Sequence, residues 1–391
     1  MNLPITANTT IGFLGAGQLA RMSAAVAFRL GMKVAVYSGS LPKTGQPLQH
    51  PLEWMTPIHY PGSFDNEQAL IEFAKSCDVI TLENEFLDGS LLARVEKASG
   101  TPIYPSPESF QMLESKWLEK ETFRKAGVPV TPYQKIDRVD QLKTFADRHG
   151  YPFVLKSSKG GYDGYGNVTV ASVEDHANAF KELRGDEGRE LIAEAFIPFE
   201  KELAVLVARN ATGSVVYPCC ETIQKDHICK TVIAPAAIAR STAEKACEIA
   251  VRATEAIDGT GLFAFEFFLT NDGELLLNES APRPHNSGHY TIEACVTSQF
   301  ENHIRAVLGL PLGSTEMRTP VAVMENVLGV HNRPAKVDGA DSLWREKEVH
   351  LHVYGKSDSR VGRKMGHITA LGNDYDSVQK IARHYAEAVE L

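Results

Sequence analysis

Short apolar runs alternate with longer amphipathic stretches along the first hundred residues. Apolar runs at residues 10–14, 33–37 and 79–82 predict strands, and the stretch that follows the glycine-containing segment 15–21 predicts a helix ending near Leu30. Strands and helices in this alternating order are typical of a parallel sheet with helices on both faces. Residues 1–104 are therefore predicted to form a doubly wound, Rossmann-like α/β domain.

The next two hundred residues predict further strands and helices around a glycine-rich segment. Residues 107–126 predict one long amphipathic helix whose charged side chains mostly face solvent. Strands are predicted at residues 152–157, from residue 168, and at 190–197, 202–209 and 215–223, and helices at 241–257 and 292–308. We assign residues 105–315 to a second domain, with a flexible lid around residues 150–190.

The last segment predicts a small β-rich domain, residues 316–391. Strands are predicted at residues 321–328, 349–354 and 367–371, followed by a closing helix. No internal repeat or low-complexity linker divides the sequence, so the domains are expected to pack closely. The predicted fold class combines α/β and α+β architecture.

Two glutamates in a predicted hairpin form the most informative pattern. Asp272-Gly273 between apolar runs is typical of a two-residue type I′ loop, which pairs Asn271 with Glu274 and places Glu266 opposite Glu279. Facing carboxylates repel unless a cation lies between them, and Mg²⁺ suits two carboxylates with nucleotide phosphates. A solvated surface hairpin is the alternative. The surrounding apolar runs, which predict a sheet covered on both faces, favour the metal.

Two glycine-rich segments are candidate phosphate sites. The segment 15–18 joins the first strand to the first helix, whose N-terminus favours an anion. The same turn fits a dinucleotide site, but the second strand ends in Tyr37-Ser38-Gly39 without the carboxylate that would bind a ribose. An oxidoreductase is therefore disfavoured. Residues 160–167 hold four glycines after Lys156, and they predict either a flap that covers phosphates or a tight hairpin.

Composition narrows the class of protein. The chain has 391 residues, 43% hydrophobic and 23% charged, which is typical of a globular protein, and its net charge of −9 argues against nucleic acid or an anionic membrane as a partner. No apolar run approaches the ~20 residues of a membrane span and no secretory signal is apparent, so a cytoplasmic location is expected. The six cysteines show no metal or redox spacing and are expected to be reduced.

Lys156, the glycine-rich segment 160–167 and the carboxylate hairpin follow one another in the order typical of the ATP-grasp superfamily. The chain resembles that superfamily. Three motifs resemble one family within it, the 5-(carboxyamino)imidazole ribonucleotide synthetases of purine synthesis. They are Gly-Gly-Tyr-Asp-Gly at residues 160–164, Asn-Glu-Ser-Ala-Pro-Arg-Pro-His-Asn-Ser-Gly-His at 278–289 and Gly-Arg-Lys-Met-Gly-His at 362–367. The resemblance spans residues 12–371 and implies an ATP-grasp fold and a homodimer.

The resemblance implies a reaction in two stages. ATP phosphorylates bicarbonate to carboxyphosphate, and the amine of aminoimidazole ribonucleotide captures the carbon dioxide unit, giving a carbamate, ADP and phosphate. Both substrates are anionic and water hydrolyses carboxyphosphate, so the reaction needs a dry, electropositive chamber. Either Asp163 or His285 steers the proton that the amine loses.

The resemblance also implies roles for individual residues. Glu266 and Glu279 hold Mg²⁺. ATP is bound by Lys116, Lys156, Gly161, Gly164, Gly166, Glu194, Ala195, Phe196, Ile197, Glu202, Gln224 and Asn278. The catalytic group around bicarbonate and the amine is Tyr162, Asp163, Arg283, His285 and Asn286. The ribonucleotide is bound by Gly15, Gly17, Gln18, Glu85, Lys356, Arg363 and Lys364.

Some positions depart from the family pattern. Tyr165 replaces an arginine or lysine, Gln224 a histidine, and Lys116 an arginine, which removes a bidentate fork. Asn278 faces away in an ideal strand, so its use requires a local distortion. A sister ligase with another acceptor and a non-catalytic nucleotide sensor are the alternatives. The segment 285–289 argues against the first, and the presence of both hairpin glutamates argues against the second.

Overall fold

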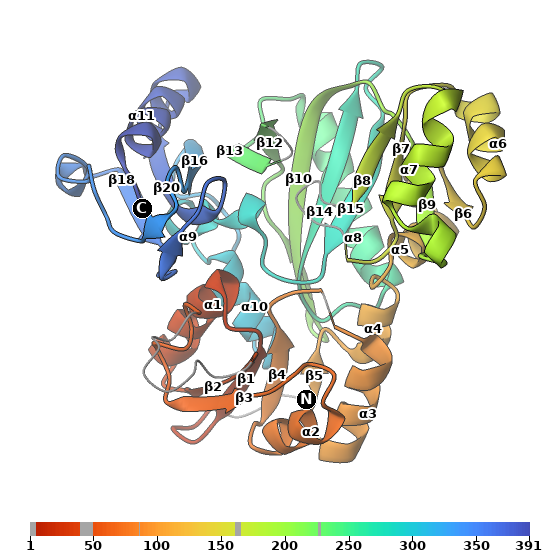
Figure 1. The fold of residues 1–391 in the computed structure, drawn as a ribbon. Helices are drawn as coiled ribbons and strands as arrows, with labels where there is room; N and C mark the ends of the chain where they lie inside the picture. The colour runs from red at the N-terminus through yellow and green to blue at the C-terminus, as the bar shows by residue number, and fades with distance from the viewer. Residues whose placement is uncertain (1–4, 40–49, 86, 161–165, 226–227) are drawn as a thin grey trace.

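The structure, a computed structural model, describes residues 5–39, 50–85, 87–160, 166–225 and 228–391. Figure 1 shows an N-terminal unit at the bottom, a small four-stranded sheet at the upper right and a large sheet that extends to the C-terminal strands. Within the described ranges, no helix combines the length and apolar character needed to cross a membrane.

The N-terminal unit is a five-stranded parallel sheet with helices on both faces, as predicted. Its strands have the order β3-β2-β1-β4-β5. Alternate residues of β2 enter two separate cores, Val34 and Val36 on one face and Ala35 and Tyr37 on the other. The elements are β1 (Thr10–Leu14), α1 (Gln18–Arg29), β2 (Lys33–Ser38), β3 (Ile58–Pro61), α2 (Glu67–Lys75), β4 (Val79–Leu82), α3 (Gly89–Ser99) and β5 (Ile103–Tyr104).

Two short helices lead from this unit into a four-stranded antiparallel sheet of order β6-β9-β7-β8. Helices α6 and α7 pack on one face of this sheet and enclose its apolar core. The elements are α4 (Pro107–Gln111), α5 (Lys116–Lys125), β6 (Tyr133–Ile136), α6 (Asp140–His149), β7 (Phe153–Ser157), β8 (Asn167–Val170), α7 (His176–Glu182) and β9 (Leu191–Ala195).

The large sheet has the order β15-β14-β10-β12-β13-β16-β20-β18, with β11 beside β10. Alternate residues of β10 enter two cores, Val205 on the side of α8 and Leu206 on the other, so the predicted burial of both faces is confirmed. The central elements are β10 (Phe199–Asn210), β11 (Gly213–Val216), β12 (Cys220–Lys225), β13 (Ile228–Ala234), α8 (Arg240–Ala256), β14 (Gly261–Thr270), β15 (Leu275–Ala281), α9 (Thr291–Ala294) and α10 (Gln299–Val307).

The C-terminal strands continue this sheet, because β16 pairs with β13 along Thr231 to Ala234. Helix α11 covers one face of these strands. The last elements are β16 (Val321–Leu328), β17 (Arg333–Pro334), β18 (Val349–Val353), β19 (Asp358–Ser359), β20 (Lys364–Gly372) and α11 (Tyr375–Ala388).

Three predicted elements are wrong because each is divided. The helix predicted at 107–126 is two helices, since Ser115 caps a new N-terminus by accepting the N–H of Leu118. Ser298 likewise caps α10 and separates it from α9. The strand predicted at 215–223 is divided between β11 and β12 by a segment that contains Pro218, which lacks the N–H a ladder requires.

The β14–β15 hairpin confirms the predicted Glu266–Glu279 pair by a different route. The Thr270 N–H donates to Glu274 O (2.9 Å), so the loop has three residues, and the predicted pairing of Asn271 with Glu274 is wrong. A β-bulge between Glu266 and Phe267 then inserts one extra residue, Asn278, into β15. The bulge offsets the longer loop and returns the two glutamates to opposite positions.

Candidate active site

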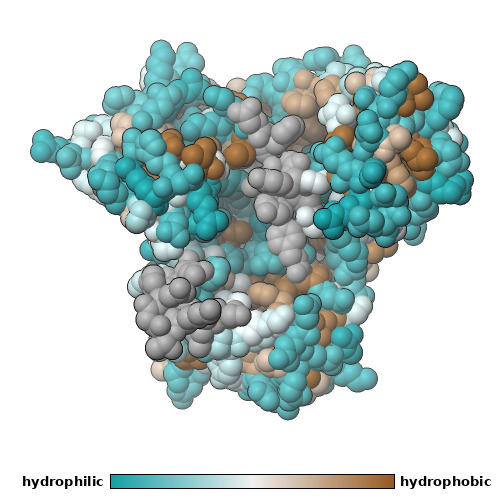
Figure 2. All heavy atoms as spheres, in the orientation of Figure 1, coloured by the Kyte–Doolittle hydropathy of each residue, from teal (hydrophilic) through white to brown (hydrophobic). Residues whose placement is uncertain are grey.

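A cavity of about 760 Å³ lies where the four-stranded sheet, the large sheet and the start of α5 meet. Figure 2 shows this side of the molecule as hydrophilic and hollowed between its lobes. Many of the predicted site residues line the cavity. They are Lys116, Lys156, Glu194, Ala195, Phe196, Ile197, Glu202, Gln224, Glu266, Asn278, Glu279, His285, Asn286 and Lys364.

The two hairpin glutamates face this cavity beside a lysine. Lys116 Nζ donates to Glu279 Oε2 at 2.6 Å. Burial would raise the pKa of Glu279, but Lys116 and Lys156 outweigh it and hold that pKa below its usual value. Burial raises the pKa of Glu266, and the facing carboxylate of Glu279 raises it further. The pair therefore has one anion stabilised by lysines, Glu279, and one carboxyl group, Glu266, that forms no ion pair with a lysine or arginine in the described part of the chain.

The bulge gives the carboxylate pair a third oxygen. Successive residues of a regular strand face opposite sides, yet Asn278 and Glu279 both line the cavity. Asn278 Oδ1 is buried and has no hydrogen-bond partner among the described residues. In the described part of the chain, no group of three or more His, Cys, Asp or Glu side chains is arranged to hold a metal. Two carboxylates and an amide oxygen fit Mg²⁺, which takes its other ligands from water and phosphates.

A buried lysine that the sequence reasoning treated as solvated reaches the same region. Lys120 is only 2% exposed, and its Nζ lies 3.3 Å from Glu194 Oε2, which also accepts a hydrogen bond from Lys156 (3.1 Å). Burial would raise the pKa of Glu194, but these lysines outweigh it and lower that pKa to about 2. The signal in the sequence was the spacing of Lys116, Lys120 and Phe123 on one helical face.

Glu202 lies across the cavity from the lysines. Burial alone raises the pKa of Glu202, to about 7. Gln224 of β12 lines the same wall, while Phe196, whose surface is 52% exposed, and Ile197 belong to the segment that joins β9 to β10. This wall carries apolar surface and a carboxylate without a neutralising cation, which suits a neutral group that donates hydrogen bonds.

The segment after β15 turns toward the N-terminal unit. Arg283 Nε and Nη2 donate to Glu85 Oε2 and Oε1 at 2.5 and 2.8 Å. Burial, Arg283 and Lys364 lower the pKa of His285 to about 3, so its 3.7 Å approach to Glu266 joins a neutral ring to a carboxyl group. Asn286 forms a reciprocal amide pair with Asn326 (2.9 and 2.7 Å).

The glycine turn before α1 binds a carboxyl group supplied by the protein itself, that of Glu83, whose pKa is raised by burial and lowered in part by the N–H of Gly17 and the charge of Arg283. The Gly17 N–H donates to Glu83 Oε2 at 2.6 Å, and a Cβ on Gly17 would lie 2.1 Å from Glu83 Oε1. A Cβ on Gly15 would lie 2.6 Å from Glu83 Oε2. The helix N-terminus thus stabilises Glu83, a partner that sequence reasoning missed because sixty-six residues separate it from Gly17.

The remaining predicted residues lie elsewhere. Lys356 Nζ donates to Lys364 O at 2.6 Å, and Arg363 Nη1 donates to Asp358 O at 2.8 Å, so these cations gather where β20 begins. Gly166 immediately precedes β8 and, like Gln18, Glu85 and Arg283, does not line the cavity. Gly161, Tyr162, Asp163, Gly164 and Tyr165 lie outside the described residues.

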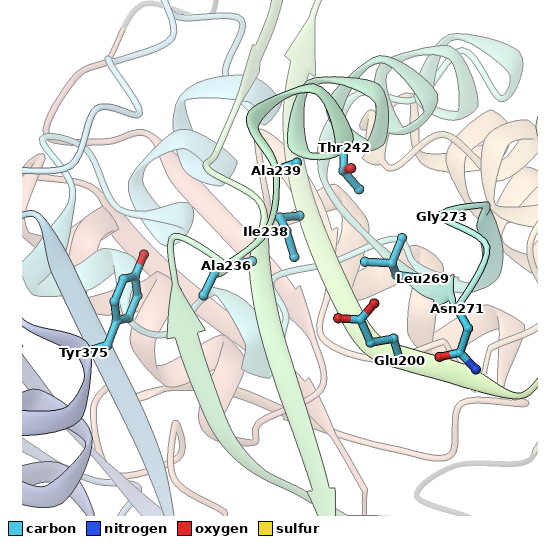
Figure 3. A pocket seen from close by; sticks show the side chains of 10 residues that line it. Glu200, Ala236, Ile238, Ala239, Thr242, Leu269, Asn271, Gly273 and Tyr375 are labelled. Atoms are coloured by element: carbon cyan, nitrogen blue, oxygen red, sulfur yellow. The ribbon is translucent and has the colours of Figure 1, made fainter.

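A second hollow of about 560 Å³ lies on the other side of β10 (Figure 3). Its walls include Glu200, Ile238, Thr242 and Leu269, and Tyr375 approaches from the start of α11. Of the residues that the structure describes, no lysine, arginine or histidine lines it. This hollow therefore does not suit an anionic nucleotide.

The cleft between two antiparallel sheets, with lysines on one wall and a carboxylate hairpin on the other, defines an ATP-grasp protein. Comparison with known families agrees. Residues 121–300 match the ATP-grasp domain, residues 8–114 the ribonucleotide synthetase preATP-grasp domain, and residues 322–381 the phosphoribosylaminoimidazole carboxylase C-terminal domain. The chain belongs to the N5-carboxyaminoimidazole ribonucleotide synthetase family of ATP-dependent ligases.

Individual relatives show how much of the chain is shared. It is 36% identical to the N5-carboxyaminoimidazole ribonucleotide synthase of Brucella melitensis, over 93% of this chain and 96% of that protein. It is 40% identical to the phosphoribosylaminoimidazole carboxylase of Ogataea methanolica, over 97% of this chain and 69% of that protein. The match to the phosphoribosylaminoimidazole carboxylase of Candida albicans covers 64% of that protein, so the chain spans about two thirds of the length of these yeast proteins.

Solved structures give the same result. The ADP complex of an N5-carboxyaminoimidazole ribonucleotide synthetase superposes with a TM-score of 0.87, at 36% identity over 97% of both chains. The Aspergillus clavatus synthase in complex with ADP and 5-aminoimidazole ribonucleotide superposes with a TM-score of 0.85, at 34% identity over 98% of this chain and 99% of that one.

Proposed function

We propose that the protein carboxylates 5-aminoimidazole ribonucleotide with bicarbonate and ATP, in de novo IMP synthesis. The products are 5-carboxyaminoimidazole ribonucleotide, ADP and phosphate. The observation that carries the proposal is the facing pair of Glu266 and Glu279 beside Lys116, in a cleft that resembles one solved with ADP and this ribonucleotide. A homodimer, expected from the family alone, and a cytoplasmic location are also part of the proposal.

The nucleotide would occupy the cavity from Glu202 to the hairpin. Lys116 and Lys156 would neutralise its phosphates, Glu202 would accept the ribose hydroxyls, and the backbone of residues 194–197 would meet the adenine edge. Glu266 and Glu279, with Asn278, would hold Mg²⁺, which when bound neutralises the phosphate oxygens. Two observations support this assignment: Asn278 Oδ1 has no hydrogen-bond partner among the described residues, and the facing carboxylate of Glu279 raises the pKa of Glu266.

The carboxylation chemistry would lie between the hairpin and the N-terminal unit. Arg283, His285 and Asn286, with Tyr162 and Asp163, would surround bicarbonate and the amine. His285 is a weak base because its pKa is about 3, which favours Asp163 as the group that takes the amine proton. Because the carboxyl group of Glu83 already accepts the Gly17 N–H at the α1 N-terminus, we assign the ribonucleotide phosphate to Lys356, Arg363 and Lys364.

The remaining ribonucleotide contacts would come from the N-terminal unit. Gly15, Gly17 and Gln18 would line the sugar, with Glu85 held beside it by Arg283.

The test is ADP release by purified protein with Mg-ATP and bicarbonate, with and without aminoimidazole ribonucleotide. We expect strong stimulation by the ribonucleotide, and labelled bicarbonate should appear in the carbamate. ADP release that ignores the ribonucleotide would keep the ATP-grasp class and overturn the proposed acceptor.

A further inference from the structure

The inward face of α5 is charged through its first two turns. Lys116, Glu119, Lys120 and Phe123 share this face at helical spacing, and Glu119 and Lys120 are 5% and 2% exposed. Burying a glutamate and two lysines is costly unless each has a specific partner. The partners of these side chains therefore show what the helix face is built to hold.

The three charged residues of this face contact three consecutive residues of β15. Lys120 Nζ donates to Asn278 O (2.9 Å), and Lys116 Nζ donates to Glu279 Oε2 (2.6 Å). Glu119 Oε1 accepts both the N–H and the hydroxyl of Ser280, each at 2.6 Å. One helix face thus contacts the bulged residue and the two residues that follow it.

The bulge needs such support because β15 is the edge strand of its sheet. Phe267 pairs with Leu277, so a regular ladder without the bulge would next pair Glu266 with Asn278. In the structure Glu266 pairs with Glu279 instead. A one-residue slip turns every later side chain to the other face, so Glu279 would leave the cavity. On the side away from β14, the described residues pair with β15 only at Leu277, through Val130. The next outward backbone groups, the O of Asn278 and the N–H of Ser280, are the groups that Lys120 and Glu119 bind.

We propose that Glu119 and Lys120 are positioning residues that fix the β15 bulge so that Asn278 and Glu279 both face the metal-nucleotide complex. The inference rests on the nucleotide site of the proposed function and extends it to α5, whose Glu119 and Lys120 do not line the cavity. Residues that orient metal ligands commonly change metal affinity or activity by about 10- to 100-fold when removed.

The experiment measures ADP binding by titration calorimetry, in Mg²⁺ and in EDTA. Glu119→Ala should weaken binding in Mg²⁺ by about 10-fold or more and leave binding in EDTA unchanged. Glu119→Gln keeps an acceptor at the position of Oε1, so it should retain most of the Mg²⁺-dependent affinity. Glu121→Ala is the matched control, because Glu121 lies on the same helix and binds Arg124 and Tyr133 rather than β15.

Three results would overturn the proposal. They are an equal loss in Mg²⁺ and EDTA, an unchanged value in both, and a loss in Glu119→Gln as large as in Glu119→Ala. If Glu119→Ala does not fold, Ser280→Ala carries the test. Ser280→Ala removes the hydrogen bond from the Ser280 hydroxyl to Glu119, which should weaken ADP binding in Mg²⁺ about 5-fold. Unchanged ADP binding in this variant would contradict the inference. The assay contains no ribonucleotide, so its outcome is independent of whether the proposed acceptor is correct.

Discussion

The guanidinium of Arg283 forms a bidentate ion pair with the carboxylate of Glu85, at 2.5 and 2.8 Å. Arg283 follows β15 of the large sheet, whereas Glu85 follows β4 of the N-terminal unit. Burial would raise the pKa of Glu85, but Arg283 outweighs it and lowers that pKa. The pair therefore joins the two units beside the proposed carboxylation site.

Glu85→Ala is expected to destabilise the protein and to impair use of the ribonucleotide, because Arg283 would lose the anion that orients it. The coupling between Glu85→Ala and Arg283→Ala should be about 1–3 kcal/mol, measured by a double-mutant cycle on the free energy of unfolding. Strictly additive single effects would show that the pair does not connect the two units.

Glu279→Ala is expected to reduce ADP release at least about 100-fold, since metal stabilisation of a transferring phosphoryl group contributes several kcal/mol. The fold should be largely intact, because removal of Glu279 relieves its repulsion with Glu266 and so offsets the loss of its ion pair with Lys116. The control is Glu274→Ala, an exposed glutamate of the same hairpin. Normal turnover in Glu279→Ala would exclude the metal assignment.

The pKa of Glu202 predicts a pH dependence of stability. Burial raises that pKa from its usual 4.5 to about 7, so between these values the folded protein keeps a proton that the unfolded chain has lost. The contribution of Glu202 to the free energy of unfolding therefore falls as pH rises from 4.5 to 7. Glu202→Gln should gain stability relative to wild type on going from pH 5 to pH 8, as measured by thermal unfolding midpoints. A constant difference would contradict the shift.

Lys356→Ala is expected to raise KM for the ribonucleotide about 10-fold and to leave KM for ATP unchanged, because charge-assisted hydrogen bonds contribute about 1.5–3 kcal/mol. Steady-state kinetics with each substrate varied in turn measures this. Lys347→Ala, an exposed lysine of the same segment, serves as the control. An effect confined to ATP would move Lys356 out of the ribonucleotide site.

Local pattern was sufficient for most elements and for the carboxylate pair. The strands at β1, β2 and β16 follow from short apolar runs, and the helix after Gly17 follows from its periodicity. The Glu266–Glu279 pair was predicted from a loop that proved one residue too short, and the bulge at Asn278 offset the error. A sequence cannot distinguish these two routes, because bulges depend on what binds the edge of the sheet.

The alternation of elements, the order of the motifs and the side chains available for ATP chemistry could all be predicted from local pattern. The burial of Glu119 and Lys120 against β15, the position of Glu83 at the α1 N-terminus and the extension of the large sheet by β16 became apparent only in the folded protein. The two sets of features differ in the sequence separation of the contacts on which they depend. Periodicity reports contacts between neighbours in the chain, whereas charge burial and strand order depend on partners far away in sequence, whose positions are fixed only when the whole core packs.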